Sequence, residues 1–397
     1  MKTYKIAVAG LGHGKSHVRA IGHLEHAECT AICDVNEDVL QSTAEEAGIK
    51  DATTDYADLL SNTDIDIICI CTPCHMHGQM VLAALDAGKH VMVETPMENE
   101  STDRLWKIIQ MAERRNLKVQ MDCADRWIAE SVKIKQLIDD GKVGNIYYVI
   151  CEYLQDIRQQ NGGVLLAKTN FRMGYGVRAQ DPVSAGAGIY AVDTAQWFLG
   201  EQFTEVFAYG NRMNLPMRNV DDHDVALFRT ASGAIARVQC SKATRRPYKE
   251  IIKSVWGTKG TVECTGYLPE PPDSTGLYAC LTDADAGAEP YEGPYEMKRV
   301  EVPAIPLPDG VTQETADEVG HDGVEFFSWL DLLSSIENDH MSQVNVYEAA
   351  RTCAGAIAVK KSKEDHRPIA IPQIVNRHEE IKPLYPLPYE KASSSEL

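Results

Sequence analysis

The feature that most constrains the fold is a strand–glycine–helix–strand pattern at the start of the chain. It begins with the apolar run Ile6–Ala9, which is typical of a strand buried on both faces of a parallel sheet. Gly10 and Gly12 follow and allow a tight turn close to a ligand, and the helix predicted after them would direct its N-terminal amides at a pyrophosphate. A second apolar run, Ala31–Cys33, ends at Asp34, where a carboxylate can accept hydrogen bonds from an adenosine ribose. This order of elements predicts a dinucleotide-binding Rossmann domain.

The glycine pattern differs from the full fingerprint at one place. The fingerprint has a third glycine or alanine where this chain has Lys15, and the glycine stands one place early, at Gly14. Asp34 is followed by Val35 and Asn36, with no arginine to accept a 2′-phosphate, so we expect NAD to be preferred over NADP. The cofactor-binding residues predicted from this stretch are Gly10, Leu11, Gly12, His13, Gly14 and Asp34.

Composition excludes several classes of protein. A length of 397 residues suits two domains, and a formal net charge of -19 argues against nucleic acid as a partner. No apolar run approaches the roughly 18 residues that a membrane span needs, and no signal peptide precedes the first strand. Eleven cysteines without an export signal indicate reduced thiols. We therefore expect a cytoplasmic protein without membrane or nucleic-acid partners.

The pattern of elements predicts an α/β fold with two domains. Buried strands alternate with helices to about Met121, which indicates a doubly wound parallel sheet, the Rossmann domain of residues 1–124. Short strands with segregated helices follow, so residues 125–375 should form an α+β domain with a mostly antiparallel open sheet. Residues 376–397 form a C-terminal tail, and Pro269–Pro294 is expected to be a surface excursion. The main predicted helices are Asn36–Ala47, Met80–Ala87, Thr102–Arg114, Ala129–Asp140, Val324–Asn338 and Val346–Lys360.

These residues resemble the glucose–fructose oxidoreductase, inositol dehydrogenase and rhizopine catabolism (Gfo/Idh/MocA) family. The resemblance rests on Ala9–Gly12 with His17, Cys33-Asp34, Thr72-Pro73 with His77, Ala84–Pro96, Asp139–Gly144, Asp193–Gly200 and Trp256–Thr261. It implies an NAD(P)-dependent dehydrogenase of a sugar or cyclitol, assembled as a homodimer or homotetramer through the second-domain sheet. It also adds Thr72, Pro73, His77, Glu94 and Thr95 to the cofactor site. For His77, a place near the nicotinamide and a helix-capping role beside Pro73 are both open.

The chain departs from the family pattern at its acid–base residues. The family's usual Glu-Lys-Pro reads Glu94-Thr95-Pro96, and a threonine hydroxyl brings no positive charge to a developing alkoxide. In the second domain, the family's aspartate and histidine are replaced by Gly186 and Tyr190, while Asp193 keeps its place. We predict Tyr190, Thr95, Asp193 and His321 as the catalytic residues. Tyr190 could instead pack between the domains, and Asp193 could orient rather than react.

The resemblance places further residues near the substrate: Arg126, Tyr153, Lys168, Arg172, Tyr190 and His321. For Arg126 the alternative is a structural salt bridge, and for His321 a surface position beside a helix. The run Asp221–Asp224 is more typical of a solvated turn than of a site. Cys69, Cys71, Cys74, His75 and His77 have the look of metal ligands, but cysteines alternating in a buried strand behave as small apolar residues, so no metal is predicted.

The sequence therefore predicts an NAD-dependent oxidoreductase. Its small-molecule carbohydrate substrate would be a sugar, glycoside or related polyol, and hydride would pass between a ring carbon and the nicotinamide. Two alternatives remain open. One is a glycosidase or lyase that oxidises its sugar only transiently, as some family members do. The other is a non-catalytic nucleotide or sugar sensor on the same fold.

Overall fold

A computed structural model of the chain describes residues 2–154, 188–214, 220–244, 251–265, 276–282, 295–320 and 323–375. By its internal contacts the chain divides into two compact units, each discontinuous in sequence. The first unit comprises Met1–Trp127, Pro306–Cys353 and Ile374–Pro386, and the second comprises Ile128–Ile305, Ala354–Gln373 and Leu387–Leu397. The sequence division assigned residues 306–353 to the second domain, whereas their contacts place them in the first unit.

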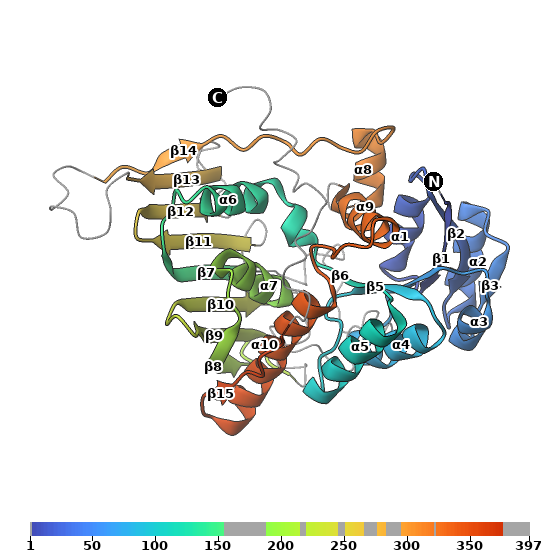
Figure 1. Cartoon of the computed structure of the whole chain (residues 1–397), viewed down its shortest axis with the longest axis horizontal. Helices are drawn as coiled ribbons and strands as arrows, with labels where there is room; N and C mark the ends of the chain where they lie inside the picture. The colour runs from blue at the N-terminus through green and yellow to red at the C-terminus, as the bar shows by residue number, and fades with distance from the viewer. Residues whose placement is uncertain are drawn as a thin grey trace. The chain divides into compact units, whose positions relative to one another are not determined.

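The first unit is built on a six-stranded parallel sheet with strand order β3-β2-β1-β4-β5-β6 (Figure 1). The strands are β1 (Tyr4–Ala9), β2 (Ala27–Cys33), β3 (Asp51–Thr53), β4 (Ile67–Ile70), β5 (His90–Glu94) and β6 (Val119–Asp122). All four residues of β4 are buried, as expected for a strand covered on both faces. The strand order reverses between β1 and β4, which is where doubly wound sheets bind their ligands. The predicted Rossmann fold is confirmed.

Helices α1 (Gly14–Ile21), α2 (Glu37–Ala47), α3 (Tyr56–Ser61), α4 (Cys74–Asp86) and α5 (Thr102–Arg115) connect these strands. Asn36 caps α2 by accepting the amides of Asp38 and Val39, and Ser101 caps α5. Helix α4 begins at Cys74, before the predicted start at Met80. Its first turns hold one buried histidine, His77, and a glycine, Gly78, so apolar periodicity does not mark them.

The late segment Pro306–Cys353 completes the first unit. It contributes α8 (Gln313–Val319), α9 (Val324–Glu337) and the start of α10 (Val346–Asp365), a helix whose residues are shared between the two units. Helix α9 packs against α1 and against the short 3-10 helix η1 (Ala124–Trp127). Phe326, Trp329 and Leu332 of α9 enter the same hydrophobic core as Ile6 and Val18.

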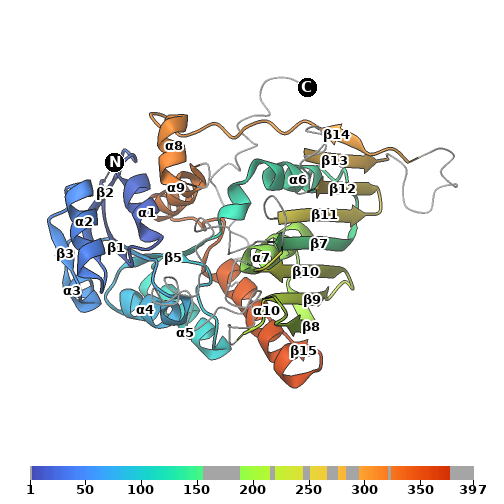
Figure 2. The same ribbon diagram turned by 180° about the vertical axis from the view of Figure 1, so that it is seen from behind.

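The second unit contains a nine-stranded sheet with order β14-β13-β12-β11-β7-β10-β9-β8-β15 (Figure 2). Its strands are β7 (Ile146–Leu154), β8 (Phe203–Asn211), β9 (His223–Thr230), β10 (Ile235–Ser241), β11 (Ile251–Gly257), β12 (Gly260–Thr265), β13 (Gly276–Leu281), β14 (Lys298–Val300) and β15 (Ile369–Ala370). The described pairs are antiparallel except β7–β10, which is parallel. Helix α7 (Gly188–Leu199) packs on β7 and β10, and α6 (Ala129–Asp139) packs on α7.

The mostly antiparallel sheet of the second domain is thus confirmed. Strand β13 lies inside the stretch predicted as a surface excursion, where prolines and glycines hid its alternation from the sequence analysis. Among the helices of the described residues, none is both long and apolar enough to cross a membrane.

Candidate cofactor and active site

The glycine-rich loop is shaped by two close approaches of its backbone. Gly10 has a φ of 90°, and a Cβ there would lie 2.6 Å from the carbonyl oxygen of Cys71. At Gly14, the first residue of α1, a Cβ would lie 2.9 Å from Cγ1 of Val8. Gly14 therefore allows the close helix–strand packing that the third glycine of the fingerprint provides. The shift of one place in the pattern leaves this packing role intact.

Asp34 connects the end of β2 to the loop. Its Oδ2 accepts a hydrogen bond from the amide of Leu11 at 2.6 Å, and its Oδ1 accepts one from the amide of Asn36 at 2.8 Å. The carboxylate thus fixes the loop backbone before any ligand arrives. A tight loop, a helix N-terminus and a carboxylate after the second strand together fit a dinucleotide, with Asp34 on its adenosine half.

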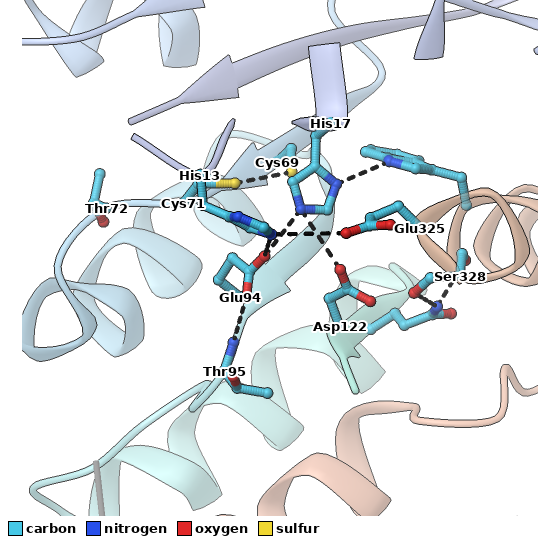
Figure 3. Close-up of polar contacts among 12 residues, drawn as sticks. His13, His17, Cys69, Cys71, Thr72, Glu94, Thr95, Asp122, Glu325 and Ser328 are labelled. Carbon is cyan, nitrogen blue, oxygen red and sulfur yellow. Dashed lines mark hydrogen bonds and ion pairs between the residues drawn. The ribbon is translucent and has the colours of Figure 1, made fainter. Parts of the chain in front are cut away.

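Five ionisable side chains, three of them buried, lie together at the carboxyl ends of β5 and β6, and we call them the carboxylate–imidazole cluster (Figure 3). Its members come from the glycine-rich loop, α1, β5, β6 and α9, and are His13, His17, Glu94, Asp122 and Glu325. Glu94 is central: its Oε1 lies 3.0 Å from His17 Nε2 and 3.2 Å from His13 Nε2. Its Oε2 accepts the amide of Thr95 at 3.2 Å.

The two carboxylates nearest to His17 have opposite pKa shifts. Burial alone would raise the pKa of Glu94, but the hydrogen bond from His17 and the charge of His13 lower it below its ordinary value. Burial raises the pKa of Asp122 to about 7, and the negative charge of Glu94 adds to this effect. Near neutral pH, Glu94 is therefore ionised while Asp122 can hold a proton. Neighbouring acids separated in this way are characteristic of sites that move protons.

Trp329 determines which nitrogen of His17 carries the proton. The indole Nε1–H, which can only donate, gives a hydrogen bond to His17 Nδ1 at 3.1 Å. Burial lowers the pKa of His17, but the neighbouring Cys71, Glu94 and Asp122 raise it by more, so the net shift of this pKa is upward. A second proton, on Nδ1, would nevertheless face the indole N–H. We therefore assign a neutral His17 with its proton on Nε2, donated to Glu94.

The hydrogen bonds of His17 bear on metal binding. Two groups of the described residues are compact enough to surround an ion, namely His13–His17–Glu94 and His17–Cys69–Cys71. Both include His17, whose Nδ1 accepts a hydrogen bond from Trp329 and whose Nε2 lies 3.0 Å from Glu94. Both nitrogens of His17 thus already have partners in the hydrogen-bond network.

His77, Thr72 and Pro73 lie at the end of β4. The ring of His77 is 1% exposed, and its two nitrogens lie 2.8 Å from the carbonyl oxygen of Pro96 and 2.6 Å from that of Thr72. It thereby ties the turn after β4 to the turn after β5. Pro73 is the N-cap residue of α4, so His77 lies in the first turns of that helix and does not cap it.

Arg126 lies in η1 and is buried. Its guanidinium donates to the carbonyl oxygen of Gln343 at 2.9 Å and forms an ion pair with Glu348 at 3.3 Å. These contacts within the first unit match the salt-bridging alternative left open by the sequence.

In the second unit, Tyr190 of α7 stacks on Tyr153 of β7, with ring centroids 6.1 Å apart. Lys242, which directly follows β10, places its Nζ 5.5 Å from the centre of the Tyr153 ring and is only 7% exposed. Asp193 is fully buried on the same helix as Tyr190. Lys168, Arg172 and His321, also predicted for the site, lie outside the described residues.

Sequence reasoning missed Lys242, Asp122, Glu325 and Trp329. Lys242 lies beside Tyr153 because β7 and β10 pair in parallel, with Ser241 opposite Leu154, and no motif encodes that register. Asp122 and Glu325 did carry a signal, because each is an acid within an otherwise apolar segment. Such buried acids need partners, which a sequence does not name.

The run Asp221–Asp224 forms part of a different polar group. Lys363 of α10 donates to Asp221 Oδ2 at 2.9 Å and to Asp224 Oδ1 at 2.8 Å. These three residues, which we call the lysine–aspartate cluster, join α10 to the start of β9 within the second unit.

The fold and the first-unit site together define a two-unit protein of the dinucleotide-binding class. Residues 4–123 match the model of an oxidoreductase family with an NAD-binding Rossmann fold, and residues 131–263 match that of the GFO/IDH/MocA C-terminal domain. The chain therefore belongs to the Gfo/Idh/MocA family of oxidoreductases.

The individual relatives described next share less than a third of their aligned residues with this chain. The uncharacterized oxidoreductase YrbE of Bacillus subtilis is 28% identical over 266 residues, which cover 66% of this chain and 74% of that protein. A glycosyl hydrolase family 109 protein of Shewanella baltica is 25% identical over 381 residues, which cover 88% of this chain and 80% of that protein. The solved structure of levoglucosan dehydrogenase with NADH and levoglucosan superposes with a TM-score of 0.73 at 19% identity. That superposition covers 93% of this chain and 100% of that chain, and it shows a shared fold.

Proposed function

We propose that this family member is an NAD-dependent oxidoreductase acting on a sugar, glycoside or related polyol. The observation that carries the proposal is the glycine-rich loop held by Asp34 in a chain of the NAD-binding oxidoreductase family. A nicotinamide cofactor would supply the hydride acceptor when bound. The carbohydrate assignment draws on solved neighbours whose substrates are sugars, levoglucosan dehydrogenase among them.

Asp34 also carries the proposed preference for NAD. Its carboxylate can accept hydrogen bonds from a ribose and would repel a 2′-phosphate, and the next two residues, Val35 and Asn36, offer no positive charge. We expect NAD to bind at least about tenfold tighter than NADP, a difference of about 1.4 kcal/mol. Titration of both cofactors by calorimetry checks this, and Asp34→Ala should narrow the gap. Equal affinities in the unmodified protein would remove the basis for the preference.

We assign Tyr190 as the acid–base residue that exchanges the substrate proton, with Thr95, Asp193 and His321 as its proposed helpers. Tyr153, Lys168 and Arg172 complete the proposed substrate set, whereas Arg126, predicted with them, is held in its salt bridge to Glu348. A cation near a tyrosine stabilises the phenolate, so Lys242 beside the Tyr153–Tyr190 stack supports base chemistry there.

Tyr190→Phe tests this role because it keeps the ring and its stacking but removes the ionisable proton. Turnover should fall by at least roughly tenfold, given that acid–base catalysis contributes about 10²- to 10⁴-fold. Cofactor affinity and the unfolding midpoint should stay near those of the unmodified protein. Tyr209→Phe, at an exposed tyrosine of β8, is the control. If turnover on a verified substrate is unchanged in Tyr190→Phe, the assignment is wrong.

A second candidate function is hydrolysis of a glycoside through transient sugar oxidation. The observation in its favour is the glycosyl hydrolase family 109 relative, which aligns over most of this chain. The same substitution at Thr95 that removes the usual lysine charge is compatible with either chemistry.

One experiment separates the two functions. The purified protein is incubated with NAD and a panel of sugars and glycosides, and both NADH absorbance and products are followed. NADH accumulating together with a matching amount of keto-sugar supports the dehydrogenase. Released sugar with catalytic NAD and no net NADH supports the hydrolase instead. Binding of neither NAD nor NADH would contradict both functions.

A further inference from the structure

We propose that His13 is the titrating acid–base group on the nicotinamide side of the cofactor site, held there by Glu94, His17 and Trp329. The proposal rests on the proposed function, because it takes the glycine-rich loop to bind a nicotinamide dinucleotide. In this role His13 responds to the charge of the nicotinamide ring, which is positive in the oxidised cofactor and neutral in the reduced one.

The four side chains form a line of two hydrogen bonds and one close ion-pair contact that runs from the core to the loop. Trp329 donates to His17 at 3.1 Å, and His17 donates to Glu94 Oε1 at 3.0 Å. The same oxygen lies 3.2 Å from His13 Nε2 (Figure 3). His17 is fully buried, whereas the side chain of His13 is 32% exposed. General acid–base sites are commonly built in this way. An accessible imidazole, here His13, is oriented by a carboxylate, here Glu94, and that carboxylate is held by a third group, here His17.

The ionised state of Glu94 decides the protonation of His13 Nε2. Glu94 accepts from His17 on one oxygen and from the Thr95 amide on the other, and it has no proton of its own to donate. The contact with His13 therefore places a proton on His13 Nε2. Nδ1 is then the nitrogen of His13 that gains or loses a proton.

Two acidic side chains of the cluster face His13. Glu94 of β5 faces it, and Glu325 of α9 places its Oε1 3.9 Å from Nε2. His17 of α1 lies edge-on to the His13 ring and is held neutral by Trp329. Asp122 of β6 stands 3.5 Å from His17 Nε2 and can hold a proton near neutral pH. The charges that face His13 in this group are thus negative.

The sheet topology places His13 on the nicotinamide half of the site. A dinucleotide lies across the carboxyl ends of the strands where their order reverses, here between β1 and β4. Asp34, after β2, marks the adenosine half. Glu94 is the last residue of β5, which lies on the other side of β1 from β2, and its Oε1 is 3.2 Å from Nε2 of His13. His13 therefore faces the other half of the cofactor.

The proposed role balances the protons of the reaction. Oxidation of an alcohol moves a hydride from carbon to the nicotinamide ring and releases the hydroxyl proton. Loss of the positive charge on a bound nicotinamide would remove its repulsion of a neighbouring imidazolium, so the proton affinity of His13 would rise at that step. Tyr190 would accept the hydroxyl proton and release it to solvent, and His13 would take up a proton from solvent at Nδ1; both transfers would reverse when the reaction runs toward the alcohol. Tyr190 remains the proposed group in contact with the hydroxyl.

Binding of NAD⁺ and NADH as a function of pH tests this without a substrate. Dissociation constants are measured by calorimetry from about pH 5.5 to about pH 8.5, where histidine titrates. The ratio of the NAD⁺ constant to the NADH constant should rise at least about threefold as pH falls, because charged His13 repels only the oxidised ring. In His13→Gln the ratio should vary much less with pH, and only the titration of Asp122 should remain. His23→Gln, at an exposed histidine of the same unit, should behave like the unmodified protein.

Two further variants keep the test decisive. His13→Lys carries a fixed charge, so its ratio should stay at the low-pH value throughout. Glu94→Gln should move the transition to lower pH, because the imidazolium loses its carboxylate. A ratio that is constant in the unmodified protein, or that varies as much in His13→Gln and His13→Lys as in the unmodified protein, overturns the role of His13. Failure of both cofactors to bind would instead contradict the proposed function.

Discussion

The carboxylate–imidazole cluster of the first unit and the lysine–aspartate cluster of the second both contain buried acids, but these acids have different partners. In the second unit, one lysine, Lys363, bonds to Asp221 and Asp224 at 2.9 and 2.8 Å. In the first unit, the partners of Glu94 are the imidazoles of His13 and His17. A lysine keeps its charge across the physiological range, whereas an imidazole changes charge within it.

The two clusters also differ in how completely their acids are packed and hydrogen-bonded. Strand β8 passes so close to the lysine–aspartate cluster that a Cβ on Gly210 would lie 2.2 Å from Asp221 Oδ2. In the carboxylate–imidazole cluster, Asp122 Oδ1 is buried and has no hydrogen-bond partner within the described residues. The comparison indicates that the first cluster is arranged to hold and release protons, and the second to join two elements.

The largest expected change in stability comes from removing the cation of the lysine–aspartate cluster. Lys363→Met leaves two acids at least partly buried without their cation, which should cost about 3 kcal/mol of unfolding free energy. Denaturant unfolding measures the loss. Lys361→Met is the matched control, since its pair with Asp365 is exposed and worth at most about 1 kcal/mol. Cofactor affinity should be nearly unchanged in both variants. A Lys363→Met protein as stable as the control would mean that the second cluster is not structural.

The next effect is the pH dependence contributed by Asp122. Its pKa is raised to about 7 in the folded protein, so its stabilising contribution is complete below its unfolded pKa and is lost as pH rises through about 7. The unfolding free energy should therefore fall by at least about 1 kcal/mol between pH 5 and pH 8 because of this group. Asp122→Asn, which mimics the protonated acid, should flatten that slope.

Thermal unfolding across this pH range provides the measurement. Burial also raises the pKa of Asp331 to about 7, so Asp331→Asn is needed beside it to separate the two contributions. A slope unaltered by Asp122→Asn would show that the first cluster does not exchange protons in this range.

The smallest effect sharpens the comparison at one hydrogen bond. Trp329→Phe removes the donor to His17, and Trp127→Phe removes an indole whose buried nitrogen has no hydrogen-bond partner within the described residues. Both variants lose similar volume from the core of the first unit. The difference between their unfolding free energies should be about 1 kcal/mol, the net value of one buried hydrogen bond. Only Trp329→Phe should alter the pH dependence of NAD⁺ and NADH binding. Equal behaviour of the two variants would mean that Trp329 does not fix His17.

The glycine-rich loop shows how much of the site could be predicted from the sequence. Gly10, Asp34 and the flanking strands lie within a short stretch of chain, and their roles follow from local backbone geometry and from the end of a strand. The family resemblance likewise pointed to Glu94 and Thr95 at the end of β5. Their positions beside the loop agree with the sheet order, since the carboxyl ends of parallel strands share one edge.

What the sequence determined by itself was therefore local: the Rossmann pattern and the place of Asp34 after its second strand. The partners of the buried charges were decided by the tertiary structure. Trp329 and Glu325 reach the first unit from a late helix, and Lys242 reaches Tyr153 through a parallel strand pair. The physical reason is that periodicity and turn chemistry act between neighbours in the chain, whereas a buried charge is stabilised by whatever group folding brings within hydrogen-bond distance. The protonation of the buried groups depends on those contacts, so it can be inferred only from the folded structure.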